Sequence, residues 1–253
     1  MTAIGIGPDT ILTVFIVFCR IGACLMVMPG FSSSRIPVQV RLFVVIGVTL
    51  ALSPIIAPIV TPEVAGAGLG QIIFLIVTES LIGAQLGLIG RIFFLALQTM
   101  VHAMAMNMGF GMMAGIPLDE AEPIPAMSTL VMMTATALIF ITDQHWEIIR
   151  GLAGSYTVIP PITGLSAQFA LIRLVDKLGE AFVLALQITA PFMLFALVIN
   201  FAMGVMNKLV QQIPVYFISI PFVIAGGLFM FYFLAGEMLM LFNTRFSNFL
   251  QNG

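Results

Sequence analysis

Long apolar runs dominate the chain, and each has the length of a membrane-crossing helix. A helix that spans the hydrocarbon core of a bilayer needs about 20 mostly apolar residues. Runs of this kind cover residues 10–29, 42–60, 71–90, 92–115, 126–142, 181–206 and 215–242. The pattern predicts an all-α integral membrane protein with six to seven long apolar helices or hairpins.

Some of these runs contain candidate bends. Only Gly90 and Arg91 separate the third run from the fourth, which predicts either one long bent helix or a tight hairpin. Pro191 and Pro221 lie inside the last two runs, where proline kinks a helix. The longest stretch with charges and turns is about residues 143–180. We therefore expect a single helical membrane domain over residues 1–253, with tilted and kinked helices and no soluble domain.

Composition excludes a water-soluble fold. Of the 253 residues, 60% are hydrophobic and 8% are charged, whereas soluble domains carry about 25% charged residues. The net charge is −2 and the nine basic residues are scattered, which argues against a nucleic-acid-binding surface.

Cys19 and Cys24 lie five residues apart, on different faces of one predicted helix, so we expect no disulfide between them.

The loop charges predict an orientation. Arg35 and Arg41 flank the first connection, which holds no acid, and basic residues in short loops favour the cytoplasm. The loop with Glu63 and the loop of residues 117–125 hold acids but no base. Counted over seven spans, this predicts an outer N-terminus and a cytoplasmic C-terminus.

Four charged residues fall within or at the edges of the apolar runs: Arg20, Glu79, Arg91 and Glu237. An ionisable group at membrane depth is costly, so it faces the protein interior or water. One interpretation is a set of interhelical salt bridges and polar contacts, which we favour. The alternative is a proton or ion relay in a small-molecule secondary transporter.

Metal-binding and catalytic patterns are weak. Asp143, His145 and Glu147 alternate, but alternate positions on a helix point about 200° apart and do not converge on a metal. Ser155 and Ser166 are conceivable nucleophiles, yet a nucleophile needs a base within hydrogen-bond reach. We predict no enzyme activity, no metal and no cofactor.

Residues 106–122 differ from the rest of the chain, and we call them the plug segment. They combine methionines with Gly109, Gly111 and Gly115, and end in three acids. Methionine repacks around varied shapes, and glycine allows the backbone to leave a helix with positive φ. Non-helical backbone at membrane depth is buried in protein or lines a cavity. Composition leaves two interpretations open: core filler followed by an ordinary turn, or a deformable closure of a conduit.

Three stretches, in this order, resemble the FliR family of flagellar type III secretion export-gate proteins, which has equivalents in virulence secretion systems. They are PGFSSSRIPVQVR (residues 29–41), TDQHWEIIRGLAGSYTVIP (142–160) and MNKLVQQIPVYFISIPFVI (206–224). The resemblance covers nearly the whole chain in length and segment order. The spelling PGFSSSRIP favours the flagellar branch.

The resemblance implies a non-enzymatic subunit in the bacterial inner membrane, at the flagellar basal body. Its partners would be FliP and FliQ in a closed helical pore, with FlhB and FlhA nearby and unfolded flagellar proteins as cargo. A loop after the third long helix would hold the pore shut. The matching plug residues are Met106, Met108, Gly109, Phe110, Gly111, Met112, Met113, Gly115 and Ile116.

Overall fold

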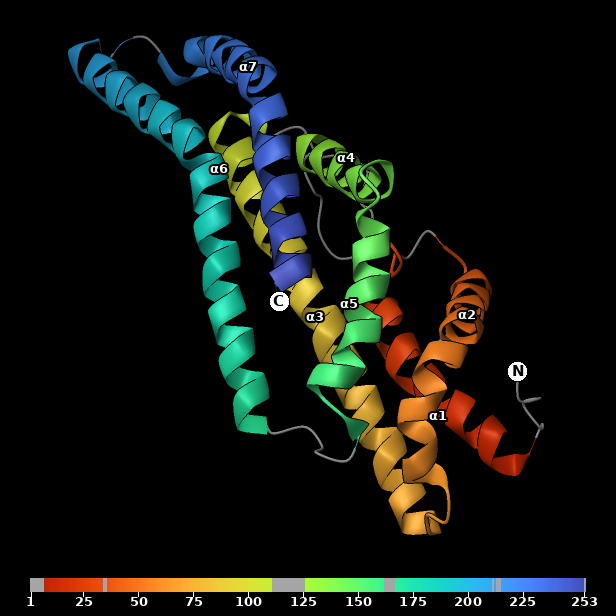
Figure 1. The fold of residues 1–253 in the computed structure, drawn as a ribbon. Coiled ribbons are helices and arrows are strands. Elements are labelled where there is room, and N and C mark those ends of the chain that lie inside the picture. The colour runs from red at the N-terminus through yellow and green to blue at the C-terminus, as the bar shows by residue number, and fades with distance from the viewer. Residues whose placement is uncertain are drawn as a thin grey trace. The chain divides into compact units, whose positions relative to one another are not determined.

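The computed structural model of the chain describes residues 7–33, 36–110, 126–161, 167–210, 212 and 215–252. Its secondary-structure elements are helices throughout these ranges (Figure 1). They are α1 (Pro8–Val27), α2 (Val38–Val64), α3 (Leu69–Asn107), α4 (Ala126–Ile141), α5 (Gln144–Val158), α6 (Ala167–Leu209) and α7 (Val215–Asn252). The predicted all-α class is confirmed.

Five of the helices are long and apolar enough to cross a membrane, namely α1, α2, α3, α6 and α7. Helices α4 and α5 pass the same test together and are bent by 70° at their junction, so they form a sixth, broken candidate. Seven apolar runs thus correspond to five or six candidate spans in the described part of the chain. The predicted orientation, with an outer N-terminus and a cytoplasmic C-terminus, was counted over seven crossings and stays a prediction.

The third and fourth apolar runs form the single helix α3, which has 39 residues. Gly90 lies inside this helix and does not break it. The sulfur of Met28 occupies the space that a Cβ at residue 90 would need. This glycine serves packing rather than a turn. The run predicted to reach residue 115 ends earlier, since α3 stops at Asn107.

Helix α2 continues through Pro54, Pro58 and Pro62. A proline cannot donate a backbone hydrogen bond, so Pro54 frees the carbonyl of Leu50. The Ser53 hydroxyl donates to that carbonyl at 3.0 Å. Local hydroxyl donors therefore help a proline-rich helix to persist, as is common in membrane helices.

The stretch of residues 143–180 is more helical than its charges predict. It holds all of α5 and the first part of α6. Asp143 separates α4 from α5 in a left-handed conformation, with φ 58°. Asp tolerates this region better than most residues, so a single residue accounts for the sharp bend between two helices.

Contacts divide the chain into two compact units. The first consists of residues 1–92 and 143–178, and the second of residues 93–142 and 179–253. In the first unit α1 packs along α2, with Gly22 against Val45, and α5 contacts α2 (Figure 1). Arg20 of α1 also bonds to Glu79 of α3 and to Ser155 of α5. Ile16, Val17 and Ile21 of α1 are fully buried there.

In the second unit the rest of α3 runs antiparallel to α7. Phe93 and Phe94 pack against Phe242 and Phe246 near one end of the pair, and Met108 reaches Gly227 near the other. Helix α4 contacts α7. The hydroxyl of Thr142, the residue after α4, donates to the side-chain oxygen of Asn243 in α7 at 3.2 Å. Helix α7 bends along its length (Figure 1) and contains the predicted kink residue Pro221.

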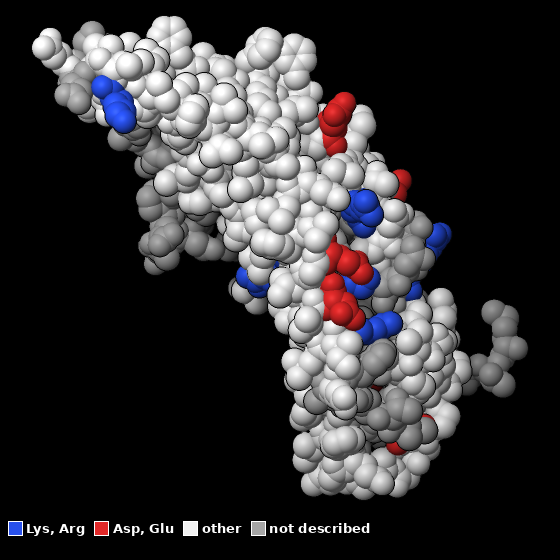
Figure 2. Space-filling model, turned by 90° about the vertical axis from the view of Figure 1, so that its left-hand side faces the viewer, with Lys and Arg blue, Asp and Glu red and all other residues white. Residues whose placement is uncertain are grey.

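Large apolar side chains lie on the outside of these helices. Phe201, Phe222 and Tyr232 are between 73% and 79% exposed. The face in Figure 2 is almost entirely uncharged, with acidic and basic side chains confined to a few places. Such surfaces require lipid or partner subunits to cover them, which fits an integral membrane protein.

Candidate functional site

A buried polar cluster joins three helices of the first unit. The Arg20 guanidinium on α1 donates from Nε and Nη2 to the two carboxylate oxygens of Glu79 on α3, at 2.6 and 2.7 Å. It also donates to the Ser155 hydroxyl of α5 at 3.1 Å and to the Ile159 carbonyl at 3.0 Å. Both charged side chains have no exposed surface. A bidentate ion pair with further hydrogen bonds is the arrangement that makes buried charge tolerable.

Tyr156 completes this polar cluster. Its ring centroid lies 3.9 Å from the Arg20 guanidinium carbon, which is a cation–π contact. Its hydroxyl reaches the Val17 carbonyl at 3.5 Å. The arginine is therefore held from several sides, and the cluster fixes α1, α3 and α5 against one another.

A stripe of glycines on α3 permits this approach: Gly83, Gly87 and Gly90. A Cβ at residue 83 would overlap the carbonyl oxygen of Arg20 and lie 3.0 Å from its Cα. A Cβ at residue 87 would lie 2.5 Å from the Cys24 carbonyl oxygen. Small residues at helical spacing allow membrane helices to approach closely, so these glycines set the α1–α3 distance.

The four charged residues predicted as polar contacts fall into two groups. Arg20 and Glu79 pair with each other, whereas Arg91 and Glu237 are exposed. Glu79 is thus engaged with a buried cation, which argues against its serving as one station of an ion relay. Arg91 belongs to the first unit and Glu237 to the second.

The weak catalytic and metal-binding patterns resolve into structural contacts. Ser155 donates to the Leu152 carbonyl at 2.7 Å and accepts from Arg20, and neither partner is a general base. Glu147 binds Arg150 at 2.9 Å on the surface of α5. Within the described ranges, no three His, Cys, Asp or Glu side chains are grouped to hold a metal ion. Cys19 and Cys24 are both free thiols, as predicted.

The first residues of the plug segment lie at the end of α3 in the second unit. Met106 is half exposed, and Met108 is fully buried with its side chain against Gly227 of α7. Gly109 follows with φ +84°, and its Cα faces Ile224. The helix therefore ends where the first glycine of the segment takes the left-handed conformation expected of it.

Phe110 is half-buried, and it is the last residue described before residue 126. The other predicted plug residues lie outside the described residues: Gly111, Met112, Met113, Gly115 and Ile116. Ser166 also lies outside them.

Sequence reasoning missed Tyr156, the glycine stripe and Gly227. The stripe carries a signal, because Gly83, Gly87 and Gly90 recur at helical spacing. Tyr156 carries none, since its role depends on an arginine 136 residues earlier in the chain (156 − 20). Gly227 is understood only from the side chain of Met108 that packs on it.

Comparison with known proteins extends over almost the whole chain. Residues 11–249 match the family described as "Bacterial export proteins, family 1". The chain is 27% identical to the flagellar biosynthetic protein FliR of Caulobacter vibrioides, over 93% of each protein. It is 26% identical to FliR of Aquifex aeolicus, over 88% of this chain and 84% of the relative. It is 23% identical to FliR of Escherichia coli, over 83% of this chain and 78% of the relative.

These relatives come from different bacteria, and each similarity covers at least 83% of this chain rather than one motif. Together with the match over residues 11–249, they confirm the resemblance predicted from three short stretches. The chain belongs to the FliR family of bacterial export proteins.

Proposed function

We propose that the chain is a core subunit of the flagellar type III export gate in the bacterial inner membrane, at the flagellar basal body. It assembles with FliP and FliQ into a closed helical pore for unfolded flagellar proteins, with FlhB and FlhA nearby. The role is non-enzymatic, and the energy for transport comes from other components. Membership of the FliR family is the observation that carries this proposal.

The surface of the helices supports an assembled state. Phe201 on α6, with Phe222 and Phe229 on α7, presents large aromatic area to the outside. Lipid can cover part of such a surface, but a pore-forming subunit also needs faces for its neighbours. Long helices with little self-burial are suited to packing against other subunits.

The plug segment, residues 106–122, is proposed to close the pore. Two observations support this, one a side-chain contact and the other a backbone angle. Met108 is fully buried against Gly227, so α3 is fixed up to that residue. Gly109 then leaves the helix with φ +84°. A chain that is fixed at its base and turns away immediately afterwards can carry Phe110 and the methionines beyond it into a conduit, where apolar side chains exclude water and ions.

Complementation and co-purification test the function. A strain that lacks this chain should be non-motile, and the wild-type gene should restore motility. The tagged chain should co-purify with FliP and FliQ. Solute uptake or efflux by the purified chain alone in liposomes, without these partners, would instead support the secondary-transporter alternative.

Replacing Gly109 with alanine should strain the base of the plug. The left-handed conformation costs an L-residue about 1–2 kcal/mol, and the new Cβ would meet Ile224 at 3.3 Å. We expect weaker closure, measured as a raised ion conductance of the assembled complex in planar bilayers. Gly66→Ala is the matched control, because Gly66 has φ +80° in the α2–α3 turn with open space around it. An equal rise in conductance for both variants would assign the effect to general strain.

A further inference from the structure

Four residues on the outer face of α7 combine a carboxylate with apolar side chains. Phe233, Gly236, Glu237 and Met240 occupy positions i, i+3, i+4 and i+7 of this helix. Four residues of one helix face form the hole that receives a side chain of a facing helix. All four are exposed, Phe233 at 62% and Met240 at 72%. We call this set the α7 hole.

Gly236 forms the floor of the α7 hole. A Cβ at residue 236 would meet no atom within 4 Å, so the chain itself leaves the space above this glycine open. Glycine weakens a helix interior, and membrane helices use it where a second helix approaches closely. The space therefore suits a side chain from another subunit.

The aromatic side of the α7 hole is held by contacts within α7. The ring centroid of Phe233 lies 4.8 Å from that of Phe229 and 5.3 Å from that of Tyr232, both edge-on. Aromatic faces attract cations. Lysine and arginine also pack their apolar stems on such surfaces while the charged end reaches a polar group. The α7 hole thus has the chemistry to receive a long basic side chain.

Glu237 lacks a compensating charge. None of the described residues forms an ion pair or a hydrogen bond with its carboxylate. It is the only charged residue between positions 215 and 244, in a helix apolar enough to cross a membrane. An ionisable group in such a run is unfavourable against lipid, so it faces protein or water. A lysine or arginine from a neighbour would supply both the opposite charge and hydrogen-bond donors.

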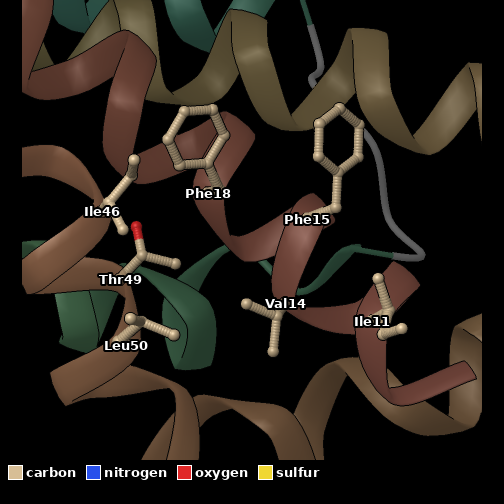
Figure 3. Close-up of a pocket in the computed structure, with 7 residues that line it drawn as sticks. All are labelled: Ile11, Val14, Phe15, Phe18, Ile46, Thr49 and Leu50. Atoms are coloured by element: carbon tan, nitrogen blue, oxygen red, sulfur yellow. The ribbon is translucent and has the colours of Figure 1, made fainter. Parts of the chain in front are cut away.

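The apolar groove between α1 and α2 carries no comparable signal. Figure 3 shows side chains of the two helices facing each other across it, among them Phe15 and Leu50. Its volume is about 310 Å³. The Thr49 hydroxyl in its lining already donates to the Val45 carbonyl at 2.7 Å. Lipid and protein can both cover such a surface, whereas the carboxylate of the α7 hole selects a cation.

We propose that the α7 hole binds a lysine or arginine side chain from a membrane helix of another gate subunit. The apolar stem would pack between Phe233 and Met240 above Gly236, and the charged end would pair with Glu237. The inference rests on the proposed function, because it names the chemistry of one contact within that assembly.

Photo-crosslinking in native membranes tests this contact. The full chain, with p-benzoylphenylalanine in place of Phe233 or, separately, of Met240, restores the strain that lacks it and is irradiated there. We expect a covalent adduct with another subunit, attached within one helical turn of a lysine or arginine, as located by mass spectrometry. An adduct with lipid alone, no adduct at either position, or attachment remote from any basic residue overturns the proposal.

Charge variants assign the adduct to the ion pair. Glu237→Gln should lose most of it and Glu237→Lys all of it. Exchange of the two charges, with Glu237→Lys here and glutamate at the partner's basic residue, should restore it. Arg245→Gln, which neutralises the other charged residue of α7, should leave it unchanged. An adduct that persists in Glu237→Lys, is lost in Arg245→Gln or is not regained on exchange overturns the proposal.

Co-purification keeps this test apart from that of the proposed function. A chain that does not co-purify with FliP and FliQ would overturn the proposed function, and this contact with it. A chain that co-purifies with both but gives no such adduct overturns the contact alone.

Discussion

The substitution Glu79→Leu should destabilise the first unit by about 3–5 kcal/mol, the cost of leaving one partner of a buried ion pair unpaired. Arg20 would keep its charge in a site with no exposed surface and lose its bonds of 2.6 and 2.7 Å to the carboxylate. Its remaining partners are a hydroxyl and a carbonyl oxygen, which carry no compensating charge. The measurement is the free energy of unfolding of the full chain in mixed micelles, followed by fluorescence of Trp146 on α5.

Two controls separate this effect from a general loss of charge. Glu147→Gln removes an ion pair with Arg150 on the surface of the same unit, and exposed pairs contribute at most about 1 kcal/mol. The double variant Arg20→Met with Glu79→Leu removes both buried charges and should recover most of the stability. A loss in Glu79→Leu no larger than in Glu147→Gln would contradict the assignment of the polar cluster as a central support.

The substitution Gly83→Ala should be nearly as damaging, because it adds a methyl group where α1 and α3 touch. The new Cβ would overlap the Arg20 carbonyl oxygen and lie 2.8 Å from its carbon. These are backbone atoms, so no side-chain rotation relieves the overlap and the helices must separate. Overpacking of this kind costs about 1–3 kcal/mol, and more in rigid places. We expect a value near the top of that range, together with a lengthened Arg20–Glu79 bond.

The matched control is Gly154→Ala on α5, where a Cβ would meet open space. Alanine stabilises a helix interior by about 0.5–1 kcal/mol relative to glycine. The two glycine-to-alanine changes should therefore have opposite signs in the same unfolding measurement. A gain in Gly83→Ala similar to the gain in Gly154→Ala would mean that helix propensity, rather than the α1–α3 approach, governs residue 83.

The fold class followed from the sequence because apolar length is a strong signal. Residues 10–29 and 126–142 lie within two residues of the bounds of α1 and α4. The boundary at Gly90 was ambiguous, since glycine marks both turns and close packing. The structure shows close packing, because the sulfur of Met28 lies where a Cβ at residue 90 would be. The helical start of α6 was missed because its charges resemble those of a loop.

The polar cluster shows a different limit. Arg20 and Glu79 stand out in sequence because each is an ionisable group in an apolar run. Their pairing cannot be read from the sequence, because they are separated by 59 residues and no local motif joins them. Ser155 was considered for the wrong role for the same reason: its hydroxyl has meaning only once Arg20 is beside it.

Ion conductance of the assembled export gate tests the central proposal most directly. The complex of this chain with FliP and FliQ is purified from wild type and from a deletion of residues 109–116, and each is placed in a planar bilayer. We predict that the wild-type complex conducts little and that the deletion complex, at unchanged subunit composition, conducts ions continuously. A fully assembled deletion complex that remains as tight as wild type would contradict the assignment of residues 106–122 as the plug.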